Sequence, residues 1–222
     1  MTSDERSPFV SVVIPTWDRA EFVSTCLGSL VEQDYPADRF EVIVVADGST
    51  DGTQQVVDEI AAATRPPAIR FISKPHGGSN SARNLGIASS AGELICLVDD
   101  DQVAPKGWLT SMIAGVGMFP DAGCFGGPMR LRLEGRPPRA CGREQLGESE
   151  LDLGEEAVET EHVWGGNMTL RRAAFETAGP FREDLVQGGE ETEWQDRARE
   201  RGIKIVYLPE PFVWHRRTAE QL

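Results

Sequence analysis

Three consecutive aspartates, Asp99, Asp100 and Asp101, follow the apolar run at residues 94–98. Neighbouring carboxylates repel one another unless water or a countercharge offsets the repulsion, and the next cationic side chain along the chain is Lys106. In an extended segment, residues two apart point to the same side, so we expect Asp99 and Asp101 to face one point while Asp100 turns away. Oxygen ligands favour Mg²⁺ or Mn²⁺ over Zn²⁺, and such ions are usually shared with substrate phosphates. The triplet therefore predicts a nucleoside diphosphate bound through a metal, although a solvated strand end or a helix N-terminus would also tolerate this charge.

Short β-rich runs alternate with helical stretches along the first half of the chain. The patterns predict strands at residues 9–14, 40–46, 69–73 and 94–98, and helices at 21–33, 54–63, 81–90 and 106–119. Such alternation indicates an α/β fold with a mostly parallel central sheet flanked by helices. Ligands of these sheets bind beyond the carboxyl ends of the strands. Residues 16–18, 47–53 and 99–101 follow three of the strands, so we expect them to meet at one edge.

Two glycine-containing segments follow predicted strands. Residues 47–53 read DGSTDGT, in which Asp51 or Thr53 can cap the next helix while Asp47 stands at the strand end. Residues 76–86 read HGGSNSARNLG, which would place backbone N–H groups and the Arg83 guanidinium near an anion. Ordinary strand-to-helix turns explain much of both patterns, so neither segment identifies a ligand without its neighbours.

Composition sets limits on the class of protein. The chain has 222 residues, of which 40% are hydrophobic, and this is enough for one domain with a large core. Its formal net charge of −14 argues against nucleic-acid binding. Residues 1–8 lack the basic and apolar regions of a secretory signal, and no run reaches the ~20 apolar residues that span a bilayer. We therefore expect a soluble, cytoplasmic protein without an integral membrane segment, and leave open peripheral contact with a membrane.

Six segments occur in an order and spacing that resemble the family-2 nucleotide-sugar glycosyltransferases with the GT-A fold. They read VVIPTWDR at 12–19, VADGSTDGT at 45–53, SARNLG at 81–86, LVDDD at 97–101, WGGN at 164–167 and GEETE at 189–193. The resemblance covers residues 9–215. It implies a single domain over residues 1–222, with a nucleotide-binding half at 9–101 and a smaller acceptor-binding half at 102–222.

A segment at residues 133–161 fits neither half. Arginines crowd its beginning, and residues 144–161 are acidic without a basic side chain. Opposed charge blocks of this kind predict a variable surface insert, which could lie over the acceptor cleft or be a plain solvated loop.

The resemblance implies an inverting, metal-dependent transfer of a sugar from a nucleoside diphosphate to an acceptor hydroxyl. By its motifs, the residues that bind the nucleotide-sugar are Pro15, Thr16, Asp18, Asp47, Arg83, Asp99 and Asp100, and the ligands of Mn²⁺ or Mg²⁺ are Asp101 and Asp99. The family usually has two acids before Gly-Ser, but here the pair is Ala46 and Asp47. A UDP-sugar is the favoured donor, with GDP- and dTDP-sugars as alternatives. Because the Gln-x-x-Arg-Trp motif of polysaccharide synthases is absent, we expect single additions rather than processive synthesis.

The acceptor side is expected at residues 164–167 and 190–193. Trp164 offers a flat face for a sugar ring, although a half-buried core tryptophan is an equal alternative. Gly165, Gly166 and Asn167 complete this motif. In the family the second acid of the later segment is the general base, which corresponds to Glu191. The alternatives are Glu193 and Glu190, and all three could simply be favourable charges at a helix start.

His215 is a further candidate metal ligand, because some relatives use a histidine near this place. A histidine at a solvent edge without any specific role is the other interpretation. Two different functions also stay open: a catalytically silent module that binds nucleotide-sugars, and a nucleotidyltransferase. The second would be expected to carry a glycine- and arginine-rich loop where this chain has PTWDR at 15–19.

Overall fold

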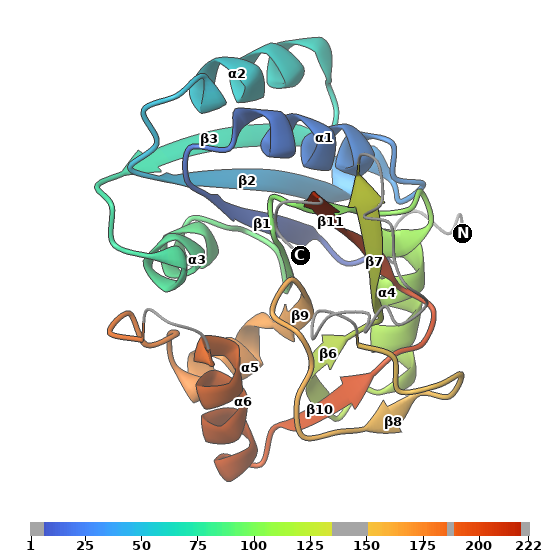
Figure 1. Cartoon of the computed structure of the whole chain (residues 1–222). Coiled ribbons are helices and arrows are strands. Elements are labelled where there is room, and N and C mark those ends of the chain that lie inside the picture. The colour runs from blue at the N-terminus through green and yellow to red at the C-terminus, as the bar shows by residue number, and fades with distance from the viewer. Residues whose placement is uncertain (1–6, 135–150, 186–188, 219–222) are drawn as a thin grey trace, which may run out of the picture.

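The computed structural model describes residues 7–134, 151–185 and 189–218, and its centre is an eight-stranded sheet with the order β3-β2-β1-β4-β9-β6-β10-β8 (Figure 1). Four strands from the first half pair in parallel: β1 (Val10–Thr16), β2 (Phe40–Asp47), β3 (Ala68–Lys74) and β4 (Leu94–Val98). Every residue of β1, β2 and β4 is buried. Most of their residues are apolar, as expected for strands covered on both faces. The buried polar residues in these strands are Ser11, Thr16, Glu41 and Asp47.

The second half of the chain adds the other strands and makes the sheet mixed. The strand β9 (Asn167–Arg171) lies antiparallel between β4 and β6 (Ala122–Gly126). Beyond them, β10 (Lys204–Tyr207) pairs in parallel with β6, and β8 (Val158–Glu159) closes the edge in antiparallel. The predicted mostly parallel sheet is thus confirmed, with β9 as an antiparallel insertion at its centre.

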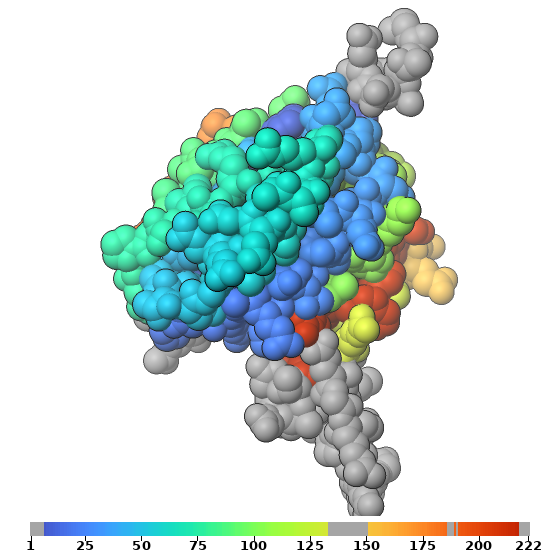
Figure 2. Space-filling view, turned by 90° about the horizontal axis from the view of Figure 1, so that it is seen from above, coloured from blue at the N-terminus to red at the C-terminus, as the bar shows by residue number. Residues whose placement is uncertain are grey.

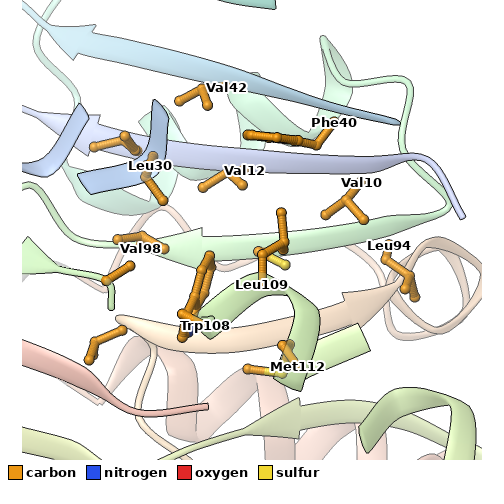
Figure 3. Close-up of a cluster of buried hydrophobic side chains, with 14 of the residues drawn as sticks. Val10, Val12, Leu30, Phe40, Val42, Leu94, Val98, Trp108, Leu109 and Met112 are labelled. Atoms are coloured by element: carbon orange, nitrogen blue, oxygen red, sulfur yellow. The ribbon is translucent and has the colours of Figure 1, made fainter. Parts of the chain in front are cut away.

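A 3₁₀ turn, η2 (Ala37–Arg39), precedes β2. One face of the sheet is covered by three helices. The helices are α1 (Ala20–Val31), α2 (Thr53–Ala63) and α4 (Trp108–Met118). Leu30 and Trp108 from these helices pack with Val12 of the sheet in a continuous apolar cluster (Figure 3). In the space-filling view, α1 and α2 lie side by side at the surface of this face (Figure 2).

The opposite face carries α3 (Ser79–Ala88), α5 (Arg172–Ala178) and α6 (Glu190–Glu200). Ile87 of α3 and Trp194 of α6 share a second apolar cluster with Ile95 and Leu97 of β4. Helices on both faces leave only the ends of the strands open to a ligand, which agrees with the general location of binding sites in such sheets.

A separate three-stranded sheet stands beside the carboxyl end of β4. It has the order β5-β11-β7, formed by β5 (Gln102–Val103), β11 (Val213–Thr218) and β7 (Met129–Glu134). Because β11 pairs with β5 directly after the aspartate triplet, His215 lies opposite Gln102. The small sheet therefore brings the end of the described chain to the acidic motif.

The described part of the insert predicted at residues 133–161 includes strand residues. Residues 133–134 belong to β7 and residues 158–159 belong to β8. Residues 135–150, which carry most of the arginine cluster and the start of the acidic run, lie outside the described residues. Among the helices that the structure describes, none combines the length and apolar character needed to cross a bilayer.

Candidate functional site

A cavity of about 520 Å³ opens at the carboxyl ends of β1, β2 and β4. Its walls come from the ends of these strands and the segments that follow them, from the start of α3 and from residues 164–166. One residue of α6 and two residues of β11 also line it. The strand ends therefore meet as the sequence predicts. Both halves of the chain contribute to one cavity.

The aspartate triplet forms a turn rather than an extended segment. The Gln102 N–H donates to the carbonyl of Asp99 at 3.2 Å, which closes a four-residue turn. The alternation expected for an extended chain does not apply in a turn, and all three aspartates line the cavity. The prediction that Asp100 turns away is therefore wrong.

Arg19 supplies the countercharge for two of the aspartates. Its Nη1 lies 3.0 Å from Asp100 Oδ1 and 3.2 Å from Asp101 Oδ2. Burial raises the pKa of Asp100 to about 6, although a hydrogen bond from Thr16 at 2.7 Å and the charge of Arg19 act in the opposite direction. Burial would also raise the pKa of Asp101, but His215 and Arg19 outweigh it and the pKa lies below its ordinary value.

Asp99 is held by a different arginine. Arg83 Nη2 donates to Asp99 Oδ1 at 3.0 Å, and Arg83 Nη1 donates to Asn80 Oδ1 at 3.3 Å. The guanidinium is buried, whereas 34% of the Asp99 side chain is exposed. Gly166 packs directly against this aspartate, since an added Cβ would lie 2.6 Å from Asp99 Oδ2. The two predicted site residues Asp99 and Arg83 therefore lie together at the cavity wall.

Two of the predicted metal ligands, Asp101 and His215, lie close together in the cavity. His215 is buried, and its Nε2 lies 3.5 Å from Asp101 Oδ1. This separation is longer than a direct hydrogen bond, and it suits two ligands of one ion. The described residues contain no cluster of three or more His, Cys, Asp or Glu side chains arranged for a metal. Asp101 and His215 alone would leave the other positions around an ion to substrate oxygens, and their role as ligands stays a prediction.

Asp47 holds the segment between β3 and α3. Its Oδ1 accepts hydrogen bonds from Lys74 Nζ at 2.6 Å and from the Gly77 N–H at 2.9 Å, and its Oδ2 accepts one from the Gly78 N–H at 2.7 Å. Burial alone would raise the pKa of Asp47, but these hydrogen bonds lower it below the ordinary value. Two backbone N–H groups of the glycine segment therefore donate to an anion of the protein itself, Asp47.

Asp18 joins two of the segments that follow strands. It has a left-handed backbone with φ 49°, and its Oδ1 accepts from the Thr50 N–H at 2.6 Å. Its neighbours Pro15 and Thr16 line the cavity, whereas Asp18 is not among the described residues that do. The Asp18 carboxylate thus positions the segment after β2 instead of facing the cavity.

Three of the four residues of the predicted acceptor motif line the cavity, and the fourth does not. Trp164, Gly165 and Gly166 line the cavity, and Trp164 is half-buried against the core. Asn167 is fully buried outside the lining.

The amide of Asn167 is used entirely within the protein. Its Oδ1 accepts from Trp108 Nε1 at 2.9 Å, and its Nδ2 donates to the carbonyls of Pro128 at 3.1 Å and Pro211 at 2.7 Å. These contacts tie α4 to the two segments that lead into the small sheet.

The candidate general bases differ in their surroundings. Glu191 lines the cavity next to Gly165, and within the described residues its carboxylate has no hydrogen bond or ion pair. Glu193 is outside the described lining and forms a two-pronged ion pair with Arg197, with both N–O distances at 3.0 Å. The side chain of Glu190 lies outside what the structure describes. Of the two candidate bases whose side chains are described, Glu191 is thus the one that lines the cavity and has no described partner for its carboxylate.

Several lining residues were missed by the sequence reasoning. Trp17 is 55% exposed, and its ring lies 4.6 Å from the ring of His76 at the cavity edge. Its position between Thr16 and Asp18, both predicted site residues, was the available signal. Arg19 lies directly after the same motif, but its pairing with residues more than 80 positions away has no local signature.

Comparison with known proteins gives matches along most of the chain. The family model described as Glycosyl transferase family 2 matches residues 11–179. The glycosyltransferase AglE of Haloferax volcanii is 30% identical over 211 residues, which cover 94% of this chain and 67% of AglE. The probable glycosyltransferase YdaM of Bacillus subtilis is 27% identical over 219 residues, which cover 93% of this chain and 50% of YdaM. The chain therefore spans 50 to 67% of the length of these curated relatives.

Solved structures with the same fold include nucleotide-sugar complexes. A mannosyltransferase from Pyrobaculum calidifontis, in complex with GDP-Man and Mn²⁺, has a TM-score of 0.73 at 21% identity and covers 93% of this chain and 56% of that one. Residues 1–349 of TarS from S. aureus, in complex with UDP-GlcNAc, have a TM-score of 0.73 at 22% identity and cover 94% and 58%. These likenesses confirm the expected GT-A fold.

Proposed function

The chain belongs to glycosyl transferase family 2, and we propose that it transfers a sugar from a nucleoside diphosphate sugar to a hydroxyl acceptor, one unit at a time and with inversion. The observation that carries this proposal is the position of Glu191. Its carboxylate lines the same cavity as the aspartate triplet, yet it comes from the second half of the chain. A donor held by the aspartates and an acceptor held near Glu191 would therefore meet in one cavity.

The donor side offers groups suited to a diphosphate. Asp101 and His215 would hold Mn²⁺ or Mg²⁺, which would stabilise the negative charge that develops on the leaving phosphate. Arg217 also lines the cavity and adds a cationic side chain there. The exposed ring of Trp17 provides a surface on which a nucleobase can stack. A UDP-sugar is the favoured donor, and the UDP and UDP-GlcNAc complexes of TarS, which share this fold, support it. A GDP-sugar is the alternative, because a mannosyltransferase with this fold is in complex with GDP-Man.

The acceptor side offers a base and an apolar face. Glu191 would take the proton of the acceptor hydroxyl while that oxygen attacks the anomeric carbon and the carbon–phosphate oxygen bond breaks. One displacement of this kind inverts the configuration at carbon. The half-buried Trp164 would lie against a sugar ring, and Gly165 lines the cavity beside it.

Turnover with a base variant tests the proposal. With Mn²⁺, a nucleoside diphosphate sugar and an acceptor panel, release of nucleoside diphosphate should fall by about 10²- to 10⁴-fold in Glu191→Gln. The matched control is Glu193→Gln, whose wild-type carboxylate pairs with Arg197 on the same helix. If Glu191→Gln keeps the full rate, the base assignment is wrong. If the wild-type chain binds donors but never releases product, the silent binding module is the better description.

The donor class can be found before the acceptor is known. A ligand present at 100 times its dissociation constant stabilises the protein that binds it by ~2.7 kcal/mol. Thermal unfolding with uridine, guanosine, cytidine and thymidine diphosphates, each with and without Mn²⁺, should therefore single out one base. Equal melting temperatures in all samples would contradict nucleotide binding.

A further inference from the structure

Two consecutive residues of α3 hold the two sides of the cavity. Arg83 donates to Asp99 on the donor side at 3.0 Å. The next residue, Asn84, turns to the segment between α5 and α6 and pairs with the backbone of Phe181. Its Oδ1 accepts from the Phe181 N–H at 3.0 Å, and its Nδ2 donates to the Phe181 carbonyl at 2.9 Å and to Glu183 Oε1 at 3.0 Å.

Phe181 in turn fixes α6, the helix of Glu191. Its ring centroid lies 5.5 Å from that of Trp194, which is fully buried one turn after Glu191. Trp194 Nε1 also donates to the carbonyl of Gly179 at 2.8 Å. The segment at residues 179–181 is therefore a rigid support for the start of α6, and Asn84 ties that support to α3.

Asn84 contributes little to the apolar core. The buried residues of α3 are Asn80, Ala82, Arg83, Gly86 and Ile87, whereas Asn84 is half-buried. Asn80 provides a second link, because its Nδ2 donates to the Arg182 carbonyl at 2.7 Å. The loss of the Asn84 amide should thus alter the placement of the segment without removing α3 from the sheet.

We propose that Asn84 is a positioning residue, which sets the place of Glu191 relative to the aspartates through Phe181 and Trp194. The inference rests on the proposed function, since it takes Glu191 as the general base. Because Arg83 and Asn84 are adjacent in one helix, the distance between the donor site and the base depends on a short and stiff connection. A small shift at Asn84 therefore moves the base away from the acceptor without disturbing the donor contacts.

The test compares Asn84→Asp with Asn84→Ala. Aspartate keeps the acceptor for the Phe181 N–H but faces the Phe181 carbonyl and Glu183 with a negative oxygen, whereas alanine removes both hydrogen-bonding atoms. We expect kcat to fall roughly tenfold to hundredfold in both variants, because a displacement of about 1 Å can cost that much. The dissociation constant for nucleoside diphosphate with Mn²⁺, measured by calorimetry, should stay within about twofold of wild type, since Arg83 is unchanged.

Arg182→Ala is the matched control in the same segment. The Arg182 side chain is exposed and pairs only with Asp184 among the described residues, so its loss should leave kcat and affinity unchanged. If both Asn84 variants bind the nucleotide more weakly in proportion to their loss of kcat, or are unfolded at the assay temperature, the positioning role is overturned.

A double variant separates positioning from general damage. In the Glu191→Gln background, Asn84→Asp should reduce the remaining rate by less than about twofold, because the group that Asn84 places is already lost. Multiplicative losses would show that Asn84 does not act through Glu191. A full rate in Glu191→Gln alone overturns the assigned base, whereas a slow Glu191→Gln beside a fully active Asn84→Asp overturns only the present inference.

Discussion

Replacement of Gly166 by alanine should disturb the aspartate cluster in a way that can be worked out from the structure. The added Cβ would overlap Gln102 Nε2 and lie 2.6 Å from Asp99 Oδ2. Gln102 has no room to move, because its side chain is fully buried and its Oε1 accepts from the Asp99 N–H at 3.2 Å. The contact with Asp99 would be relieved by rotation of its side chain, which would break its ion pair with Arg83. The overlap with Gln102 would remain as strain.

The expected magnitude follows from the cost of overpacking. An extra methyl group in a packed site usually destabilises a protein by about 1 to 3 kcal/mol. For a domain of this size, 1 kcal/mol lowers the melting temperature by about 2 to 4 °C, so Gly166→Ala should melt about 2 to 12 °C below wild type. The affinity for nucleoside diphosphate should also fall, since Asp99 would be displaced at the cavity wall.

Gly165→Ala is the matched control. Its added Cβ would meet the side chain of Glu191 at 3.4 Å, near ordinary van der Waals contact. We expect a change in stability within about 0.5 kcal/mol. Thermal unfolding and calorimetric titration with uridine diphosphate and Mn²⁺ provide both measurements. The reasoning is refuted if Gly166→Ala matches wild type in melting and affinity, or if the two alanine variants are equally destabilised.

Three further predictions concern other contacts of the cavity. The pKa of Asp47 is lower in the folded protein than in the unfolded chain. The stability that this carboxylate contributes is therefore fully present above its unfolded pKa of about 3.9 and is lost as pH falls through the folded value. The difference in melting temperature between wild type and Asp47→Asn should be largest near neutral pH and shrink below pH ~4, and a constant difference would contradict the assigned hydrogen bonds. His215→Ala should weaken Mn²⁺ binding in the presence of nucleoside diphosphate by at least about tenfold, as measured by paramagnetic resonance of free Mn²⁺, and unaltered binding would remove His215 from the ligands. Trp17→Ala should lose about 1 to 3 kcal/mol of nucleotide affinity without a change in melting temperature, because its ring is exposed and stacking on an aromatic ring is worth that amount; equal affinity would exclude the ring as the base platform.

The local pattern of the sequence was sufficient for the elements of the first half and for their order. The predicted strand at residues 94–98 is β4, and the predicted helix at 54–63 differs from α2 by one residue. Whether an apolar run bounded by turn residues forms a strand or a helix depends mostly on residues a few positions away. A single sequence is therefore enough to predict these elements. The meeting of three strand ends followed from the same alternation, because parallel strands share the edge at which they end.

Tertiary structure decided which partner each polar side chain takes. Asp101 meets His215 from β11, Asp100 meets Arg19 from the segment after β1, and Asp47 is used to hold the segment before α3. Asn167 follows two cavity glycines in the sequence, yet its amide forms its hydrogen bonds inside the core. Such pairings join residues far apart along the chain, and their choice depends on the register of β11 and the antiparallel insertion of β9. No local period encodes either feature, because both arise only when the two halves of the chain pack together.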